Sequence, residues 1–334
     1  MTSRNILIIG GSGFIGSAIV AKLSAEGKRV IVPARRRERA KHLITLPTVD
    51  VVTADVHDTA TLARLSQGMN AVINLVGVLH SDTGTPWGKR FQAAHVSLAG
   101  SVAEAAAGAG VPRLLHMSSL GADANGPSMY LRSKAAGEAA VRAAVNAAGG
   151  SVGATASGPY VTMFRPSVVF GRGDKFINLF AWMQRYAPVV ALGKPDAKLQ
   201  AIWVEDVAQA FVNALDDART FGKTYELGGP KVYTLKQLME YAGSVSGHAR
   251  PVFGLPDRLA YLQARLMEFA PVEMLSRDNL DSTKVDSVIS AAALHTMQTE
   301  LGITPAAMEA VVPGYLSGQS PKERYTQLRD HARR

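Results

Sequence analysis

The sequence predicts a doubly wound α/β fold, in which helices cover both faces of a parallel β-sheet. Strand and helix patterns alternate through the first half of the 334 residues. Each link between strands is long enough to hold a helix, which makes neighbouring strands parallel. A buried apolar strand also runs straight into a glycine turn near the N-terminus. Together these observations predict a sheet that is covered on both sides.

Short apolar runs mark the strands, and longer stretches of helical periodicity lie between them. The predicted strands are 5–9, 29–33, 50–53, 71–75, 113–117 and 160–164, and the predicted helices are 14–25, 36–46, 59–66, 89–109 and 128–147. Residues 147–159, rich in Gly, Ala and Ser, are expected to form a surface loop. We expect residues 1–165 to form the core domain. Residues 166–334 should return further strands to the sheet and form a smaller, mainly helical lobe for a substrate or partner.

Composition excludes several classes of protein. The chain has no cysteine, so disulfides, thiolate nucleophiles and cysteine-ligated metals are excluded, and no metal site is expected. It has no run of about 18 uncharged apolar residues that would predict a transmembrane helix. The net charge is +9, but the basic residues are scattered and not interleaved with aromatic ones, so no nucleic-acid partner is expected. The expected location is the cytoplasm or the inner face of a membrane.

The glycine turn after the first strand is the strongest sign of function. Gly10, Gly13 and Gly16 stand between a strand and an apolar helix. Gly10 should allow the tight turn, Gly13 should let the backbone approach a phosphate, and Gly16 should let the helix pack against the strand. The helix N-terminus then offers N–H groups to the pyrophosphate of a dinucleotide. The predicted contacts from this turn also include Ser12, Phe14 and Ile15.

The residues after the second strand indicate which dinucleotide binds. A protein that binds NAD usually has an acidic side chain there, which holds the ribose 2′-hydroxyl. This chain has Ala34 at that place, followed by Arg35 and Arg36. A guanidinium suits a 2′-phosphate and leaves a hydroxyl without an acceptor. The sequence therefore favours NADP(H) over NAD(H), which remains the alternative, and Arg37 and Arg39 are interpreted as part of an exposed helix.

Further cofactor contacts are expected after the third and fourth strands, at the sheet edge where such folds bind ligands. Asp55 and Val56 are placed to meet the adenine, with the carboxylate accepting from its amino group. Asn74, Val76 and Gly77 are expected near the adenine ribose and the phosphates. An alternative role for Asp55 is to cap the helix that begins at 59.

Tyr130 and Lys134 are the candidate acid–base pair. Their spacing of four places both side chains on one face of a predicted helix. A phenol titrates near 10, and a nearby ammonium lowers its pKa toward a range that suits proton transfer. The same ammonium can hold ribose hydroxyls of the nicotinamide. The alternative is a surface lysine on an ordinary helix, and the glycine turn upstream favours the functional interpretation.

The glycine turn and the Tyr-xxx-Lys motif together resemble the extended short-chain dehydrogenase/reductases. The strings at 116–124, 130–134, 165–171 and 229–235 resemble one atypical subgroup, built around the nucleotide-binding accessory subunit of respiratory complex I and its bacterial relatives. The resemblance covers about residues 5–285 and implies a Rossmann fold with a tightly held NADP(H). The contacts that it implies are the glycine turn, Arg35, Asp55, Tyr130, Lys134 and Pro166.

The chain departs from the active reductases of that superfamily at two places. Active members carry a serine after the fifth strand that hydrogen-bonds the substrate carbonyl. Here Leu120 takes that place, with Ser118 and Ser119 next to it. His95 replaces an asparagine that helps to organise a proton relay, and we interpret it as a structural histidine. Loss of a carbonyl-polarising donor costs about 3 kcal/mol of transition-state stabilisation.

Two functions follow from these residues. The favoured one is a binding protein that holds NADP(H) and assists the assembly or stability of respiratory complex I or a related quinone-linked membrane system. The alternative is an NADP-dependent reductase, epimerase or dehydratase for a carbonyl or sugar-like substrate. In it Tyr130 would be the acid–base group, tuned by Lys134, and Ser118 or Ser119 would polarise the carbonyl.

The expected partners are the dinucleotide and a membrane-bound respiratory complex or membrane surface. No oligomeric state is predicted. The amphipathic stretch at 252–267 is interpreted as core of the smaller lobe. A docking face for a membrane or a membrane-bound partner is the alternative interpretation of the same stretch.

Overall fold

The computed structural model describes residues 4–148, 158–268 and 275–317. Its main element is a seven-stranded sheet with the order β11-β6-β5-β4-β1-β2-β3. Every neighbouring pair in this sheet is parallel. The strands are β1 (Asn5–Ile9), β2 (Arg29–Ala34), β3 (Val49–Thr53), β4 (Ala71–Asn74), β5 (Arg113–Met117), β6 (Tyr160–Pro166) and β11 (Thr224–Leu227).

The strand order reverses at β1, which is where a doubly wound sheet binds its ligand. Leu7 of β1 lies opposite Ile31 of β2 on one side and Val72 of β4 on the other. The chain therefore leaves β1 toward β2 and β3 and later returns to the other side of β1 as β4. The loops that follow β1 and β4 meet at this reversal.

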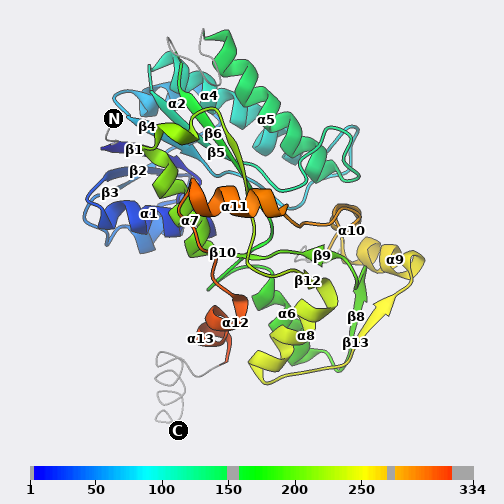
Figure 1. The fold of residues 1–334 in the computed structure, drawn as a ribbon. Coiled ribbons are helices and arrows are strands. Elements are labelled where there is room, and N and C mark those ends of the chain that lie inside the picture. The colour runs from blue at the N-terminus through cyan, green and yellow to red at the C-terminus, as the bar shows by residue number, and fades with distance from the viewer. Residues whose placement is uncertain (1–3, 149–157, 269–274, 318–334) are drawn as a thin grey trace. The chain divides into compact units, whose positions relative to one another are not determined.

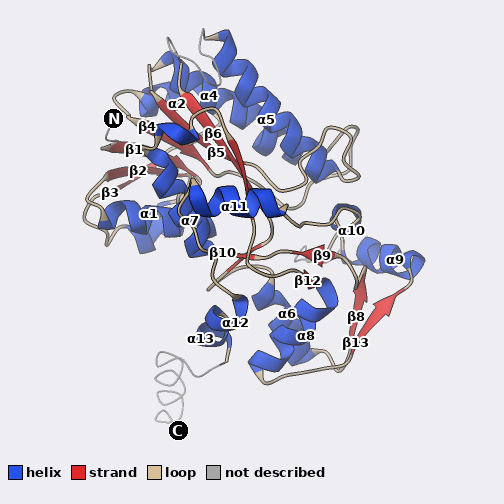
Figure 2. Cartoon of the chain, viewed as in Figure 1, coloured by secondary structure: helices blue, strands red, loops and turns tan. Residues whose placement is uncertain are grey.

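Helices cover both faces of the sheet (Figure 2). On one face α1 (Phe14–Ala25) packs against α7 (Val204–Leu215), and on the other α4 (Leu98–Gly108) packs against α2 (Thr59–Ser66) and α5 (Met129–Ala147). The strands are apolar almost throughout because both of their faces are buried. The doubly wound α/β fold is confirmed.

Several elements differ from the sequence prediction in detail. Residues 36–46 contain a short 3₁₀ helix, η1 (Arg37–Leu43), and the predicted helix at 89–109 is three segments: α3 (Lys89–Phe91), the π-helix η2 (Gln92–Ser97) and α4. The π-helix occurs where α5 approaches closely, since a side chain at Gly137 would overlap the His95 carbonyl. Within the predicted loop at 147–159, residues 149–157 lie outside the described residues.

The chain forms two compact units, and the first contains the large sheet. This unit comprises Met1–Pro166, Val204–Leu227 and Ile289–Thr304. The later part of the chain thus supplies β11, α7, the short 3₁₀ helix η3 (Ala218–Thr220) and α11 (Ala291–Thr299), which packs on β11. Buried Arg113 helps to hold these parts together, because its guanidinium donates to the Ala214 carbonyl and to Thr220.

The second unit comprises Ser167–Trp203, Gly228–Val288 and Pro305–Arg334. Its strands, among the described residues, form three pairs: β7 (Val169–Phe170) with β10 (Ile202–Trp203), β9 (Lys198–Leu199) with β12 (Tyr233–Thr234), and β8 (Val190–Gly193) with β13 (Val252–Leu255). Its helices are α6 (Ile177–Tyr186), α8 (Leu235–Ser246), α9 (Asp257–Met267), α10 (Arg277–Ser282), α12 (Met308–Val311) and α13 (Pro313–Leu316) (Figure 1). Helices α6 and α8 pack together around Ile177 and Leu238.

Candidate functional site

In the glycine turn after β1, the backbone segments approach each other so closely that there is no room for side chains at its glycines. Gly10 has a φ of +87°, which favours glycine, and a side chain at Gly16 would lie 2.6 Å from the Gly11 Cα. The Gly13 N–H donates to the Gly10 carbonyl at 3.0 Å, and Gly13 caps α1. A side chain at Gly10 would stand 3.3 Å from the Val76 nitrogen after β4. The turn is therefore a backbone cradle at the strand reversal, which is the form that accepts a pyrophosphate.

The side chains of the turn surround this cradle. Ser12, Phe14 and Ile15 are half-buried around it. The Ser17 hydroxyl donates to the Gly13 carbonyl at 2.7 Å and lies 2.8 Å from His42 Nε2. Sequence reasoning missed this link between the turn and η1, because nothing in the residue pattern pairs positions 17 and 42.

Arg35 follows β2 directly and is exposed, as is Arg36. The side chain of Ala34, where a carboxylate would hold a ribose hydroxyl, is buried at the strand end. Since β1 and β2 are neighbours, the end of β2 lies beside the glycine turn. The exposed charges directly after β2 are guanidinium groups, and the pairing of Arg35 with a 2′-phosphate stays a prediction.

The side chains of Asp55 and Asn74 accept hydrogen bonds from nearby backbone N–H groups. Asp55 accepts from the His57 N–H at 3.0 Å, while α2 is capped by Asp58, so the alternative role of Asp55 as the cap is wrong. Buried Asn74 accepts from the Val76 N–H at 3.2 Å and so fixes the backbone beside the glycine turn. Val56 is half-buried next to Asp55.

Lys134 joins three elements of the site. Helix α5 carries it, and its ammonium donates to the Met117 carbonyl at the end of β5 at 3.1 Å. A side chain at Gly77, after β4, would stand 3.3 Å from the Lys134 Nζ. Burial lowers the pKa of Lys134 to about 8, and the charge of Glu138 opposes that shift.

Tyr130 lies beside Ser119, and its phenol behaves differently from the sequence expectation. Burial raises the pKa of Tyr130, and a hydrogen bond with Ser119 works against that rise. The expected lowering by the Lys134 ammonium is not found, because that group is directed at the Met117 carbonyl. The Ser119 hydroxyl also lies 3.2 Å from the Leu120 carbonyl, to which it can donate. Among the candidate serines, Ser119 is thus the one beside the tyrosine.

The loop after β5 is fixed against β6. The Ser118 N–H donates to the Phe164 carbonyl at 2.7 Å, and the Leu120 N–H donates to the Pro166 carbonyl at 2.9 Å. The Leu120 side chain is buried. The Ser118 hydroxyl is buried too and has no hydrogen-bond partner among the residues that the structure describes. Pro166 therefore holds the loop that carries Ser119 rather than standing apart from the site.

His95 is a neutral histidine with both ring nitrogens occupied. The Val78 N–H donates to Nε2 at 3.0 Å, and Nδ1 lies 2.8 Å from the Ser133 hydroxyl. That hydroxyl donates to the Tyr130 carbonyl, so Nδ1 must carry the proton and donate to it. Burial, followed by the charge of Lys134, lowers the pKa of His95 to about 2. The interpretation of His95 as structural agrees with these contacts, and no metal-binding cluster occurs in the described ranges.

The free energy of unfolding should depend on pH through two buried histidines. Burial lowers the pKa of His95 to about 2 and that of His116 to about 3, so both stay neutral in the folded chain. In the unfolded chain they bind protons below about 6.5, so stability falls as the pH falls. We expect each to cost about 1 kcal/mol of unfolding free energy between pH 7 and 5.5. Urea titration of His95→Gln should show a smaller loss than the wild type, and an equal loss would contradict the assignment.

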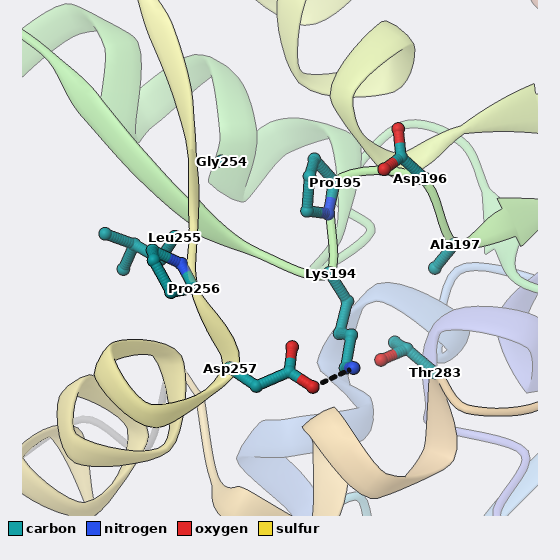
Figure 3. A pocket seen from close by; sticks show the side chains of 9 residues that line it. All are labelled: Lys194, Pro195, Asp196, Ala197, Gly254, Leu255, Pro256, Asp257 and Thr283. Atoms are coloured by element: carbon teal, nitrogen blue, oxygen red, sulfur yellow. Dashed lines mark hydrogen bonds and ion pairs between the residues drawn. The ribbon is translucent and has the colours of Figure 1, made fainter.

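A hollow of about 420 Å³ lies in the second unit, next to the start of α9 (Figure 3). The Lys194 ammonium bonds to the Asp257 carboxylate at 2.7 Å, with Thr283 on the same side of the hollow. This bond ties the loop after β8 to the first residue of α9. None of the site residues predicted from the sequence lines this hollow.

Comparison with protein families identifies the chain. Residues 6–228 match the model of the NAD dependent epimerase/dehydratase family. The chain belongs to this family. Among curated members of related sequence, a mouse mitochondrial protein named NADH dehydrogenase [ubiquinone] 1 alpha subcomplex subunit 9 is 30% identical over 312 residues, which are 90% of this chain and 77% of that protein. The ceramide reductase of Caulobacter vibrioides is 31% identical over 260 residues, 75% of this chain and 74% of that one.

Solved structures of other proteins share the fold. A dTDP-glucose 4,6-dehydratase from Streptomyces venezuelae, solved with NAD bound, superposes with a TM-score of 0.72. The two chains are 21% identical, and the match covers 95% of this chain and 97% of the dehydratase. The chain therefore has the same fold as this dehydratase.

Proposed function

We propose that this protein is an NADP(H)-dependent reductase of a carbonyl substrate. The observation that carries the proposal is the arrangement of Ser119, Tyr130 and Lys134. These side chains come from the loop after β5 and from α5, at the sheet edge that also holds the glycine turn. A hydroxyl beside the tyrosine supplies the donor that Leu120 lacks, which favours the enzyme over a protein that only binds the dinucleotide.

The three side chains suit reduction. The dinucleotide, when bound, supplies a hydride to the carbonyl carbon. Tyr130 stays protonated at neutral pH, because burial raises its pKa, and can give its proton to the carbonyl oxygen. The Ser119 hydroxyl can donate a hydrogen bond to that oxygen. Lys134, with a pKa of about 8, remains largely protonated at pH 7 and can hold ribose hydroxyls.

The preference for NADP(H) rests on the exposed Arg35 at the end of β2. A charged hydrogen bond contributes about 2 kcal/mol, so Arg35→Ala should weaken NADPH binding roughly 30-fold and leave NADH binding nearly unchanged. Fluorescence titration with both dinucleotides measures this. Arg39→Ala is the matched control, because Arg39 is exposed within η1. An equal effect of Arg35→Ala on both dinucleotides would contradict the 2′-phosphate assignment.

The activity is tested by NADPH consumption with a panel of carbonyl compounds. Because one relative is named ceramide reductase, the panel includes a keto analogue of ceramide beside simple ketones and nucleotide sugars. We expect one class to be reduced to an alcohol at a rate that falls to background when Tyr130 becomes Phe. A reduction that persists in the Tyr130→Phe protein would remove the proposed mechanism.

A second candidate function is support of a respiratory membrane complex, and the mitochondrial relatives favour it. In this function the protein would hold NADP(H) and assist assembly or stability of the complex, at the inner face of the membrane. A deletion strain should then lose complex I content. Complementation with the Tyr130→Phe variant separates the two functions, because an assembly role survives that change and a reductase role does not.

A further inference from the structure

The outward face of α9 is apolar, which reverses the usual arrangement of a surface helix. Its inward side carries the small residues Ala260 and Ala264, both buried. Leu259, Leu262 and Leu266 are 51%, 53% and 65% exposed. At 100° per residue, these leucines fall within an arc of about 60°. The interpretation of this stretch as core of the smaller lobe is therefore wrong for its leucines.

The inward side of α9 carries small side chains because the neighbouring elements approach it closely. Figure 1 shows α9 after β13 and beside β8 and α10, the two elements against which it packs. A side chain at Gly193 in β8 would stand 2.9 Å from the Ala260 Cβ, which leaves no room there for a leucine. The leucines are thus on the outside because alanines are required inside. Phe253 of β13, at 58% exposed, adds a further apolar side chain just before α9.

The charges around the leucine stripe are positive. Asp257, at the start of α9, is paired with Lys194, and Glu268, just after its end, is paired with Arg277. Arg258 and Arg265 are exposed at the edge of the stripe, and neither forms a salt bridge within the described part of the chain; the charge of Arg265 does help to lower the pKa of Glu268. The acidic groups are thereby neutralised, and two guanidinium groups remain beside the leucines.

We propose that the stripe of Leu259, Leu262 and Leu266, flanked by Arg258 and Arg265, docks this protein on an anionic lipid bilayer. Leucines on one side of a helix enter the boundary between headgroups and acyl chains, and arginines beside them reach lipid phosphates. No helix in the described part of the chain is long and apolar enough to cross a bilayer, so α9 would lie in the plane of the surface. The proposal does not depend on whether the protein is a reductase.

Sedimentation with vesicles tests the docking. We expect the full chain to sediment with phosphatidylcholine vesicles that contain phosphatidylglycerol, and about tenfold less with phosphatidylcholine alone. Changing the three leucines to Ser should abolish binding, and Arg258→Gln with Arg265→Gln should weaken it several-fold and reduce its dependence on salt. All five side chains are exposed, so the fold should survive, which circular dichroism checks.

Matched control variants show whether binding depends on the leucine stripe or on exposed apolar and charged side chains in general. Val232→Ser changes another exposed apolar side chain of the same unit, and Arg172→Gln with Lys175→Gln removes two other exposed charges. These variants should bind vesicles as the wild type does. Two results would overturn the proposal. One is a wild-type protein that does not bind anionic vesicles, in which case a partner protein would cover the stripe. The other is a triple leucine variant that binds them normally.

Discussion

Replacing Tyr130 with Phe is expected to lower kcat for carbonyl reduction by about 10²–10⁴-fold, while the affinity for NADPH stays within about twofold. The reason is that the phenol is the proton donor, and general acid catalysis is worth that much. Steady-state kinetics on the substrate found by the NADPH assay measure kcat, and equilibrium titration measures the affinity. A Tyr130→Phe protein that loses NADPH affinity but keeps kcat would show that Tyr130 only binds the dinucleotide.

The neighbouring serines provide the matched comparison for that experiment. Ser119→Ala should lower kcat about 10²-fold, because it removes the donor beside the tyrosine. Ser118→Ala should leave kcat nearly unchanged, because the Ser118 hydroxyl is buried and the hydrogen bond of Ser118 is made by its backbone N–H, which donates to the Phe164 carbonyl. The reverse order of effects would reassign the carbonyl-polarising role to Ser118.

Replacing Gly16 with Ala is expected to abolish NADPH binding and to lower the free energy of unfolding by about 3 kcal/mol. The new methyl group would overlap the Gly10 carbonyl oxygen and crowd the Gly11 backbone, neither of which can move without distorting the turn. Gly108→Ala is the control, because apart from its chain neighbours and its own helix backbone nothing lies within 4 Å of the methyl group that it adds. That change should preserve binding and stability, as measured by titration and urea unfolding.

The elements that sequence patterns define locally were predicted closely. β1, β5, α1 and α2 have the predicted bounds, because apolar runs, glycine breaks and helical periodicity are all read within a few residues. The helix at 89–109 was predicted as one α-helix, and the π-helix within it was missed. It lies beside Gly137, 42 residues after His95, whose lack of a side chain lets α5 approach the His95 carbonyl.

The sequence could propose the residues of the candidate site but not their geometry. The spacing of Tyr130 and Lys134 predicts a shared helix face, yet the direction of the Lys134 ammonium depends on the Met117 carbonyl in another element. The choice between Ser118 and Ser119 likewise depends on how the loop binds to β6. The face of α9 that points outward was predicted wrongly, because periodicity shows that a helix is amphipathic but not which neighbours leave room only for alanine.

The most direct test of the central claim is equilibrium titration of the wild-type protein with NADPH and with NADH under the same salt. The exposed Arg35 after β2 and the backbone cradle of the glycine turn predict that NADPH binds at least about tenfold more tightly. Equal affinity for the two dinucleotides, tighter binding of NADH, or binding of neither would contradict it.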